Sequence, residues 1–243
     1  MSTTPSRSSA AAWSCTGAAD PALDGGHRMS ARVSYPEATR ILAARDPVLA
    51  GLVAEAGAMR IRRRTMSPFE ALVQAIVYQQ LAGPAARAIH GRLVAALDDR
   101  VEPEALLALS DETLRSVGLS SAKVRSLRDL ASKALDGMLV LSPRALARRS
   151  DEEVVARLSS VRGIGPWTAQ MFLIFQLRRL DVWPVADLGV RHGYGLAWNV
   201  PTPSARELEP LGEPYRPYRT VLTWYCWRAA ELRAGAAASA VTT

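Results

Sequence analysis

The residues best suited to chemistry in this chain are a Gly163-Ile164-Gly165-Pro166 turn and an aspartate, Asp187, that follows it. Two glycines one residue apart allow a tight turn and the close approach of another backbone, and Pro166 fits the first turn of a helix. The free N–H groups and the dipole at such a helix start favour an anion such as a phosphate. A tight corner between two helices, without a ligand, explains the same residues, so the turn alone leaves both interpretations open.

Asp187 ends the sequence DVWPVAD and precedes the helix-like segment LGVRHGYGLAWNV. Aspartate is a favoured residue at the start of a helix, where its side chain accepts backbone N–H groups. An ionised carboxylate can also stabilise a cationic transition state or activate a water molecule. One residue can do both, and the sequence around Asp187 admits either role.

The elements that must position these residues are predicted to be helices. Ser67 and Glu70, like Ser150 and Glu153, have the spacing of a capping box at the start of an apolar helical pattern. Gly83-Pro84 interrupts the first of these helices and another amphipathic segment follows. No segment predicts a strand with comparable strength, so we expect an all-α fold.

Composition narrows the classes of function. The 243 residues include 30 Lys and Arg against 23 Asp and Glu, a formal charge of +7 that suits a polyanionic partner such as nucleic acid. Two cysteines and three histidines, scattered along the chain, exclude a Cys-rich zinc site, a four-cysteine iron–sulfur cluster and a histidine-built metal site. With no apolar run of about 18 residues and no signal sequence, we expect a cytoplasmic protein without a membrane span.

The two ends of the chain differ from its centre. Residues 1–30 are rich in Ser, Thr, Ala and Gly, without periodicity, and are predicted to be disordered. A start at Met29 is a hypothesis that the sequence leaves open. A second disordered tail is expected over 233–243.

Three segments resemble a known superfamily. The segment 161–193, VRGIGPWTAQMFLIFQLRRLDVWPVADLGVRHG, resembles the helix-hairpin-helix and catalytic aspartate of the DNA glycosylase superfamily. The segment 76–93 resembles the helix pair that carries the DNA-wedging loop of its alkylation-repair members, and 214–228 resembles their C-terminal aromatic helix. The resemblance extends over residues 35–232 and is greatest to the DNA-3-methyladenine glycosylase II family.

The resemblance implies an all-α, two-lobed fold with the active site in the cleft between the lobes. The glycosylase domain would occupy residues 31–232. Its central lobe, 68–180, would carry the wedge and the hairpin, and its second lobe would combine 31–67 with 187–232.

The resemblance also implies roles for individual residues. Asp187 would be the catalytic carboxylate, although Ala186 stands where some members carry a second acid. Leu81 would be the wedge that fills the gap left by an extruded base, although a loop leucine covering the core would look the same. The residues implied to line the base pocket are Trp167, Met171 and Trp227. The residues implied to bind DNA are Gln80, Arg162, Gly163, Gly165 and Thr168.

Two of these residues carry most of the implied chemistry. Trp167 occupies the position at which glycosylases with lyase activity have a lysine that forms a Schiff base, so the resemblance implies a monofunctional enzyme. The π-face of Trp167 or Trp227 would select an alkylated purine, which carries a positive charge. A core role for either tryptophan remains the alternative. Arg219 is a candidate for binding a phosphate or for orienting the catalytic loop.

The function implied is extrusion of a 3-methyladenine or 7-methylguanine from double-stranded DNA and hydrolysis of its N-glycosidic bond in base excision repair. The protein would act as a monomer, without a required cofactor and without a metal held by side chains, although the hairpin carbonyls of this superfamily can hold a monovalent cation. The alternatives are a non-catalytic DNA-binding paralogue and a glycosylase for other damaged purines.

Overall fold

The structure, a computed structural model, describes residues 33–240, with side chains up to residue 234. These residues form helices and connecting turns without a strand, which confirms the predicted all-α class. They divide into two units: unit 1 comprises 63–178, and unit 2 comprises 33–62 with 179–240. The predicted disordered segment 1–30 lies outside the described residues.

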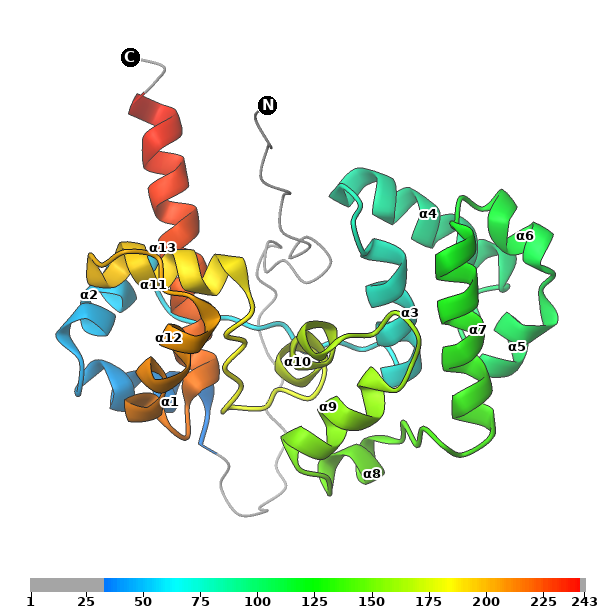
Figure 1. Cartoon of the computed structure of the whole chain (residues 1–243), viewed down its shortest axis with the longest axis horizontal. Helices are drawn as coiled ribbons and strands as arrows, with labels where there is room; N and C mark the ends of the chain where they lie inside the picture. The colour runs from blue at the N-terminus through cyan, green and yellow to red at the C-terminus, as the bar shows by residue number, and fades with distance from the viewer. Residues whose placement is uncertain (1–32, 241–243) are drawn as a thin grey trace. The chain divides into compact units, whose positions relative to one another are not determined.

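Unit 1 is built from consecutive helices (Figure 1). Their bounds are α3 (Pro68–Tyr78), α4 (Gly83–Ala96), α5 (Pro103–Ala108), α6 (Asp111–Ser116), α7 (Ser121–Leu135), α8 (Pro143–Ala147), α9 (Asp151–Ser159) and α10 (Pro166–Phe175). Helix α7 packs against α3, α5 and α6, and α10 packs against α9 and α3. Helices α3 and α10 are buried along most of their length, as their nearly continuous apolar sequences require.

Unit 2 combines helices from both ends of the chain. Its elements are α1 (Tyr35–Ala43), α2 (Pro47–Ala56), α11 (Leu188–Trp198), α12 (Ala205–Leu211), a 3₁₀ turn η2 (Glu213–Tyr215) and α13 (Arg219–Ala240). Helix α13 packs against α1, α2 and, most extensively, α11. Gly193 permits that last contact, because a Cβ atom there would lie 1.8 Å from the carbonyl oxygen of Cys226 on α13.

The capping residues explain where the helices begin. The Ser67 hydroxyl accepts the Glu70 backbone N–H at the start of α3, and at Ser150 and Glu153 both halves of the predicted capping box form. Asp187 is the N-cap of α11, as the sequence suggests.

Two predicted boundaries need correction. Gly83-Pro84 opens α4 instead of interrupting α3, which already ends at Tyr78; proline is tolerated in the first turn, where its missing N–H costs nothing. The disordered tail predicted from residue 233 is wrong for residues 233–240, which continue α13. Alanine dominates this stretch, and alanine has the highest intrinsic helix propensity.

Candidate active site

Asp187 is a buried carboxylate, only 3% exposed, at the N-terminus of α11. Its Oδ1 accepts the backbone N–H of Val190 at 2.8 Å and the indole N–H of Trp227 at 3.1 Å. Both donors and the N-terminal end of the helix dipole stabilise a negative charge at this position. The arrangement therefore holds an acidic group in a fixed orientation inside unit 2.

Gly189 makes the contact between Asp187 and Trp227 sterically feasible. A Cβ atom at this position would lie 3.1 Å from Oδ1 of Asp187 and 3.2 Å from Cδ1 of Trp227. Cys226, the neighbour of Trp227, is fully buried, and burial together with the charge of Asp187 raises the pKa of its thiol far above the ordinary value. Cys226 is thus a packing residue and not a thiolate nucleophile.

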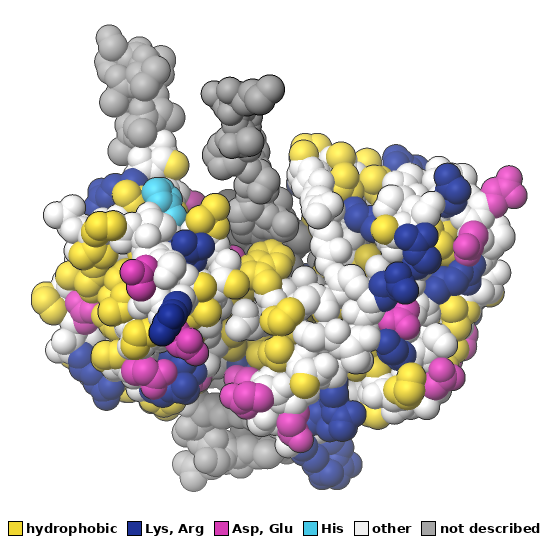
Figure 2. Space-filling view, in the orientation of Figure 1, with side chains coloured by type: hydrophobic (Ala, Val, Ile, Leu, Met, Phe, Trp, Pro, Cys, Tyr) yellow, Lys and Arg dark blue, Asp and Glu magenta, His cyan; other side chains and the backbone are white. Residues whose placement is uncertain are grey.

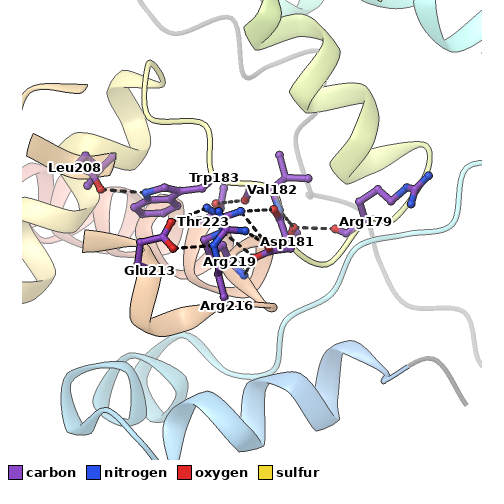
Figure 3. A network of polar contacts seen from close by, with 10 residues as sticks. Arg179, Asp181, Val182, Trp183, Leu208, Glu213, Arg216, Arg219 and Thr223 are labelled. Atoms are coloured by element: carbon purple, nitrogen blue, oxygen red, sulfur yellow. Dashed lines mark hydrogen bonds and ion pairs between the residues drawn. The ribbon is translucent and has the colours of Figure 1, made fainter. Parts of the chain in front are cut away.

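The segment that leads to Asp187, residues 179–187, has no regular structure and is fixed by side chains of α13 (Figure 3). The Thr220 hydroxyl donates to the carbonyl of Arg179 and accepts the N–H of Val182. The Thr223 hydroxyl donates to the carbonyl of Val182 at 3.0 Å. These hydroxyls satisfy buried backbone groups that a helix or sheet would otherwise pair.

An ion-pair network fixes the start of the same segment. The guanidinium of Arg219 donates from Nε to Oδ1 of Asp181 at 2.7 Å and from a terminal nitrogen to Oδ2 at 2.9 Å. Arg216 donates to the same Oδ2 at 2.8 Å (Figure 3). The Arg219 side chain is 13% exposed, so of its two predicted roles the structure favours orienting the loop over binding a phosphate.

The predicted hairpin of unit 1 is a tight connection between α9 and α10. Gly163 has a φ of +78°, a left-handed conformation that favours glycine, and Gly165 is the N-cap of α10. Both glycines and Arg162 are exposed, whereas Thr168 is buried. The sequence pattern therefore identifies a helix start whose turn is open to a partner.

Helix α7 contacts the backbone of the hairpin through Asp129. Asp129 accepts the backbone N–H of Arg162 at 2.7 Å and the ammonium of Lys133 at 2.9 Å. Burial opposes the charge on Asp129, but these two donors outweigh it and lower its pKa below the ordinary value. Asp129 consequently remains an ionised acceptor for the hairpin backbone.

Leu81 lies in the short turn between α3 and α4 and is partly exposed. The turn is tight, because Gln80 adopts a left-handed φ of +57° and the N–H of Leu81 donates to the carbonyl of Tyr78. Left-handed conformations of non-glycine residues are strained and concentrate at functional sites. Gln80 is exposed, whereas the side chain of Gln79 donates to the carbonyl of Gly163 at 2.8 Å.

The residues predicted for a base pocket are divided between the units. Trp227 lies beside Asp187 in unit 2, and Trp167 and Met171 lie on α10 in unit 1, partly exposed and buried respectively. The contact between Trp227 and Asp187 was not predicted. The sequence predicts that the aromatic face of Trp227 contacts the base, whereas in the structure the indole N–H of Trp227 donates to Asp187.

The basic residues of unit 1 are spread over helices α4 to α9 among acidic ones, with one group near α8 (Figure 2). Several are engaged in the fold: Arg128 binds Asp111 and two backbone carbonyls, and both Lys123 and Lys133 donate to backbone carbonyls.

Within residues 33–240, no cluster of His, Cys, Asp and Glu has the composition of a metal site, and no helix is long and apolar enough to span a membrane.

A comparison with protein families decides the classification. The sequence model described as "HhH-GPD superfamily base excision DNA repair protein" matches residues 73–217, from within α3 to two residues after η2. The chain belongs to the HhH-GPD superfamily. The matched range contains the Leu81 turn, the hairpin and Asp187, so the predicted superfamily is confirmed.

Relatives of known name support the same classification. DNA-3-methyladenine glycosylase 1 of Schizosaccharomyces pombe is 35% identical over 168 residues, which cover 68% of this chain and 73% of that protein. The crystal structure of a DNA-3-methyladenine glycosidase from Bacillus halodurans superposes with a TM-score of 0.75 at 34% identity, covering 82% of this chain and 91% of that one. The S. pombe 3-methyladenine DNA glycosylase Mag1 in complex with abasic DNA gives a TM-score of 0.69 at 33% identity, with 79% and 95% covered.

The HhH-GPD fold here also uses residues that sequence reasoning missed. Asp181, Thr220 and Thr223 fix the segment before Asp187, and Lys123 contacts the Leu81 turn. The signal available in the sequence was weak: two threonines near the start of an aromatic-rich helix, and an aspartate next to a valine and a tryptophan. Polar groups in such positions usually bind backbone.

Proposed function

We propose that this protein is a DNA glycosylase that removes alkylated purines, such as 3-methyladenine and 7-methylguanine, from double-stranded DNA in base excision repair. The observation that carries the proposal is Asp187, a buried carboxylate held by two N–H donors at a helix N-terminus in a member of the HhH-GPD superfamily. The names of the most similar relatives support the alkylated substrate class.

Asp187 acts on the sugar of the extruded nucleotide. Cleavage of the N-glycosidic bond develops positive charge on the ring oxygen and C1′, and the carboxylate stabilises that charge and orients or deprotonates the attacking water. The Val190 N–H and the Trp227 indole hold the carboxylate through Oδ1, so its orientation is set before substrate binds. The leaving base needs little activation, because alkylation gives its ring a positive charge.

We assign recognition of the damaged base to aromatic and soft apolar residues within each unit, Trp167 and Met171 on α10 and Trp227 on α13. A cationic ring is attracted to the electron-rich face of tryptophan, and an undamaged neutral base lacks that attraction. Met171 is only 1% exposed, so its polarisable thioether supports this surface from inside unit 1 and does not itself face solvent. This discrimination suits a substrate class defined by charge and not by one hydrogen-bonding pattern.

The hairpin binds the DNA backbone. Gly163 and Gly165 expose the start of α10, whose first N–H groups have no partner within the helix, and a phosphate would complete them. Because Thr168 is only 5% exposed, it contributes its backbone N–H and not its hydroxyl. Arg162 adds a positive charge at the exposed turn, and a monovalent cation bound to the hairpin carbonyls would add a second.

The chain offers few lysine amines for the Schiff-base chemistry of a lyase. Its sequence contains only two lysines, Lys123 and Lys133. Lys123 donates to the carbonyls of Val77 and Gln79, and Lys133 binds Asp129 and the carbonyl of Ser160. With Trp167 at the position of the lyase lysine, the enzyme is monofunctional and leaves an abasic site.

Borohydride trapping checks the monofunctional reaction. When the protein acts on alkylated duplex DNA in the presence of borohydride, we expect no covalent adduct on a denaturing gel, because no amine forms an iminium with C1′. A glycosylase with lyase activity, treated in parallel, serves as the positive control. A stable adduct on the damaged duplex would contradict the monofunctional assignment, because it would show that an amine of this protein serves.

Leu81→Ala tests the wedge. The leucine fills the vacated position in the base stack and offsets part of an unstacking cost of a few kcal/mol, so its loss should slow base release from a paired lesion by roughly tenfold or more. A lesion opposite an abasic site is already loosely held, so the defect should be much smaller there. Single-turnover rates on the two duplexes measure the difference.

Leu135→Ala is the matched control for this test, since Leu135 is also an exposed leucine of unit 1, on α7. We expect it to leave both rates unchanged. If Leu81→Ala instead lowers both rates equally and reduces the melting temperature, Leu81 covers the core and the wedge lies elsewhere.

The proposed function itself is tested with methylated duplex DNA. After incubation with the protein, chromatography of the supernatant should detect free 3-methyladenine and 7-methylguanine, with Asp187→Asn protein as the blank. Duplexes with oxidised or mismatched purines should release nothing. Tight DNA binding without base release would instead identify a non-catalytic DNA-binding protein, and release of oxidised purines alone would place the enzyme in another substrate class.

A further inference from the structure

Helix α7 presents a row of polar residues, Lys123, Ser126, Asp129 and Lys133, at spacings of three and four that place them on one face. All four contact the backbone of other elements or lie against it. Lys123 contacts the end of α3, Ser126 and Asp129 contact the hairpin, and Lys133 contacts the carbonyl of Ser160 at the end of α9. We call this row the α7 polar stripe.

Lys123 is the member of the α7 polar stripe that touches the wedge turn. Its ammonium donates to the carbonyl of Val77 at 2.7 Å and to that of Gln79 at 2.9 Å. These carbonyls lie at the C-terminal end of α3, where backbone acceptors lack partners within the helix and a cation is favoured by the dipole. The left-handed residue Gln80 and Leu81 follow directly, so Lys123 binds the base of the turn that presents Leu81.

Burial of Lys123 has a cost that the two hydrogen bonds offset. Loss of solvent lowers the pKa of its ammonium below the ordinary value, and a lysine without partners would turn towards water. The hydrogen bonds to the carbonyls of Val77 and Gln79 therefore fix the position of the Lys123 side chain as well as that of the two carbonyls.

The next members of the α7 polar stripe lie against the hairpin, although the hydroxyl of Ser126 donates to the carbonyl of Ala122 in its own helix. Ser126 lies so close to Gly163 that a Cβ atom there would be 2.6 Å from the serine hydroxyl. Asp129 accepts the backbone N–H of Arg162 at 2.7 Å. Gln79 closes the connection, because its side chain donates to the carbonyl of Gly163 at 2.8 Å.

We propose that Lys123 is a positioning residue for base extrusion, which fixes the Leu81 turn relative to the phosphate-binding hairpin through the α7 polar stripe. The proposal rests on the proposed function, since it assigns Leu81 and the hairpin to DNA. A wedge can open a duplex only if the phosphates beside it are held at a constant distance. One rigid helix that contacts both loops supplies that constant distance, and Lys123 is its link to the wedge.

Lys123→Met tests this role, because methionine keeps an unbranched apolar stem of similar length and removes the ammonium. Small displacements of positioned groups change rates by as much as about 100-fold, and we expect a loss of roughly 10-fold to 100-fold in single-turnover base release from a paired lesion. The loss should shrink when the lesion lies opposite an abasic site. In a Leu81→Ala background, Lys123→Met should have little further effect, since the two residues act on the same step.

Arg128→Met is the matched control on the same helix. Arg128 donates to the carbonyls of Leu107 and Leu109 at the end of α5, so it makes the same kind of contact with a helix that carries no wedge. Its loss should lower the melting temperature without any dependence on the base opposite the lesion. If Lys123→Met behaves like Arg128→Met, or if its effect adds fully to that of Leu81→Ala, Lys123 is only a structural residue.

Hydrogen exchange provides a second test of the positioning role of Lys123, and this test does not depend on activity. Lys123→Met should accelerate deuterium uptake in peptides that contain residues 79–82 and 161–165, whereas Arg128→Met should leave both unchanged. Unaltered uptake in Lys123→Met protein would overturn the positioning role. Absence of base release by the wild-type protein would contradict the proposed function, and the exchange measurement would still decide whether Lys123 fixes the Leu81 turn relative to the hairpin.

Discussion

Asp187→Asn should abolish base release while the protein stays folded and binds DNA. Asparagine caps helices as well as aspartate does, so its side-chain oxygen can still accept the N–H groups of Val190 and Trp227. What is lost is the negative charge that stabilises the cationic sugar and activates water. We expect single-turnover cleavage to fall by roughly 10²–10⁴-fold, with the affinity for alkylated duplex nearly unchanged.

Asp46→Asn is the matched control for this substitution. Asp46 is also the N-cap of a helix in unit 2, where it accepts the N–H groups of Val48 and Leu49 and the hydroxyl of Tyr215. Its loss of charge should affect stability but not the cleavage step. Cleavage by Asp187→Asn protein within a few-fold of the wild-type rate would mean that Asp187 is only a helix cap.

Gly193→Ala should strongly destabilise the packing of α11 against α13. The new Cβ atom would lie 1.8 Å from the carbonyl oxygen of Cys226 and 2.5 Å from its carbonyl carbon, both atoms of the α13 backbone. A backbone cannot turn aside as a side chain does, so α11 and α13 must separate. Overpacking costs of about 3 kcal/mol or more are expected, equivalent to a fall in melting temperature of roughly 6–12 °C.

Gly51→Ala provides the comparison in the same unit. Gly51 lies in α2, where a Cβ atom would have no other atom within 4 Å, and alanine in a helix is favoured over glycine by about 0.5–1 kcal/mol. We expect this variant to melt at or above the wild-type temperature, as followed by circular dichroism. A Gly193→Ala protein as stable as Gly51→Ala would show that α11 and α13 tolerate a wider separation than their packing indicates.

The sequence was sufficient for the elements whose signals are local. Capping at Ser150 and Asp187, proline at the start of α10 and apolar periodicity in α3 each depend on neighbours a few residues apart, and each predicted a helix that is present. The superfamily followed from the resemblance of the hairpin and the aspartate after it to the superfamily's motif, and the matching family model covers both.

The contacts that fix the candidate site were not accessible in this way. Trp227 binds Asp187 across forty positions of sequence, Arg219 binds Asp181 across thirty-eight, and Gln79 binds Gly163 across eighty-four. The pairing of side chains with distant groups depends on how the helices pack. The periodicity of the sequence does not indicate these pairings. The alanine-rich residues after 233 differ from these contacts, because their low complexity predicts disorder whereas the structure continues α13, as the helix propensity of alanine favours.

The division of unit 2 between the two ends of the chain imposes an order on biosynthesis. Unit 1 is continuous in sequence, so its helices can complete their contacts as soon as residue 178 has left the ribosome. Helices α1 and α2 are made first but pack against α11 and α13, which are made last. Until then their apolar faces have only each other, and a nascent chain stalled before residue 219 would display them to chaperones and proteases.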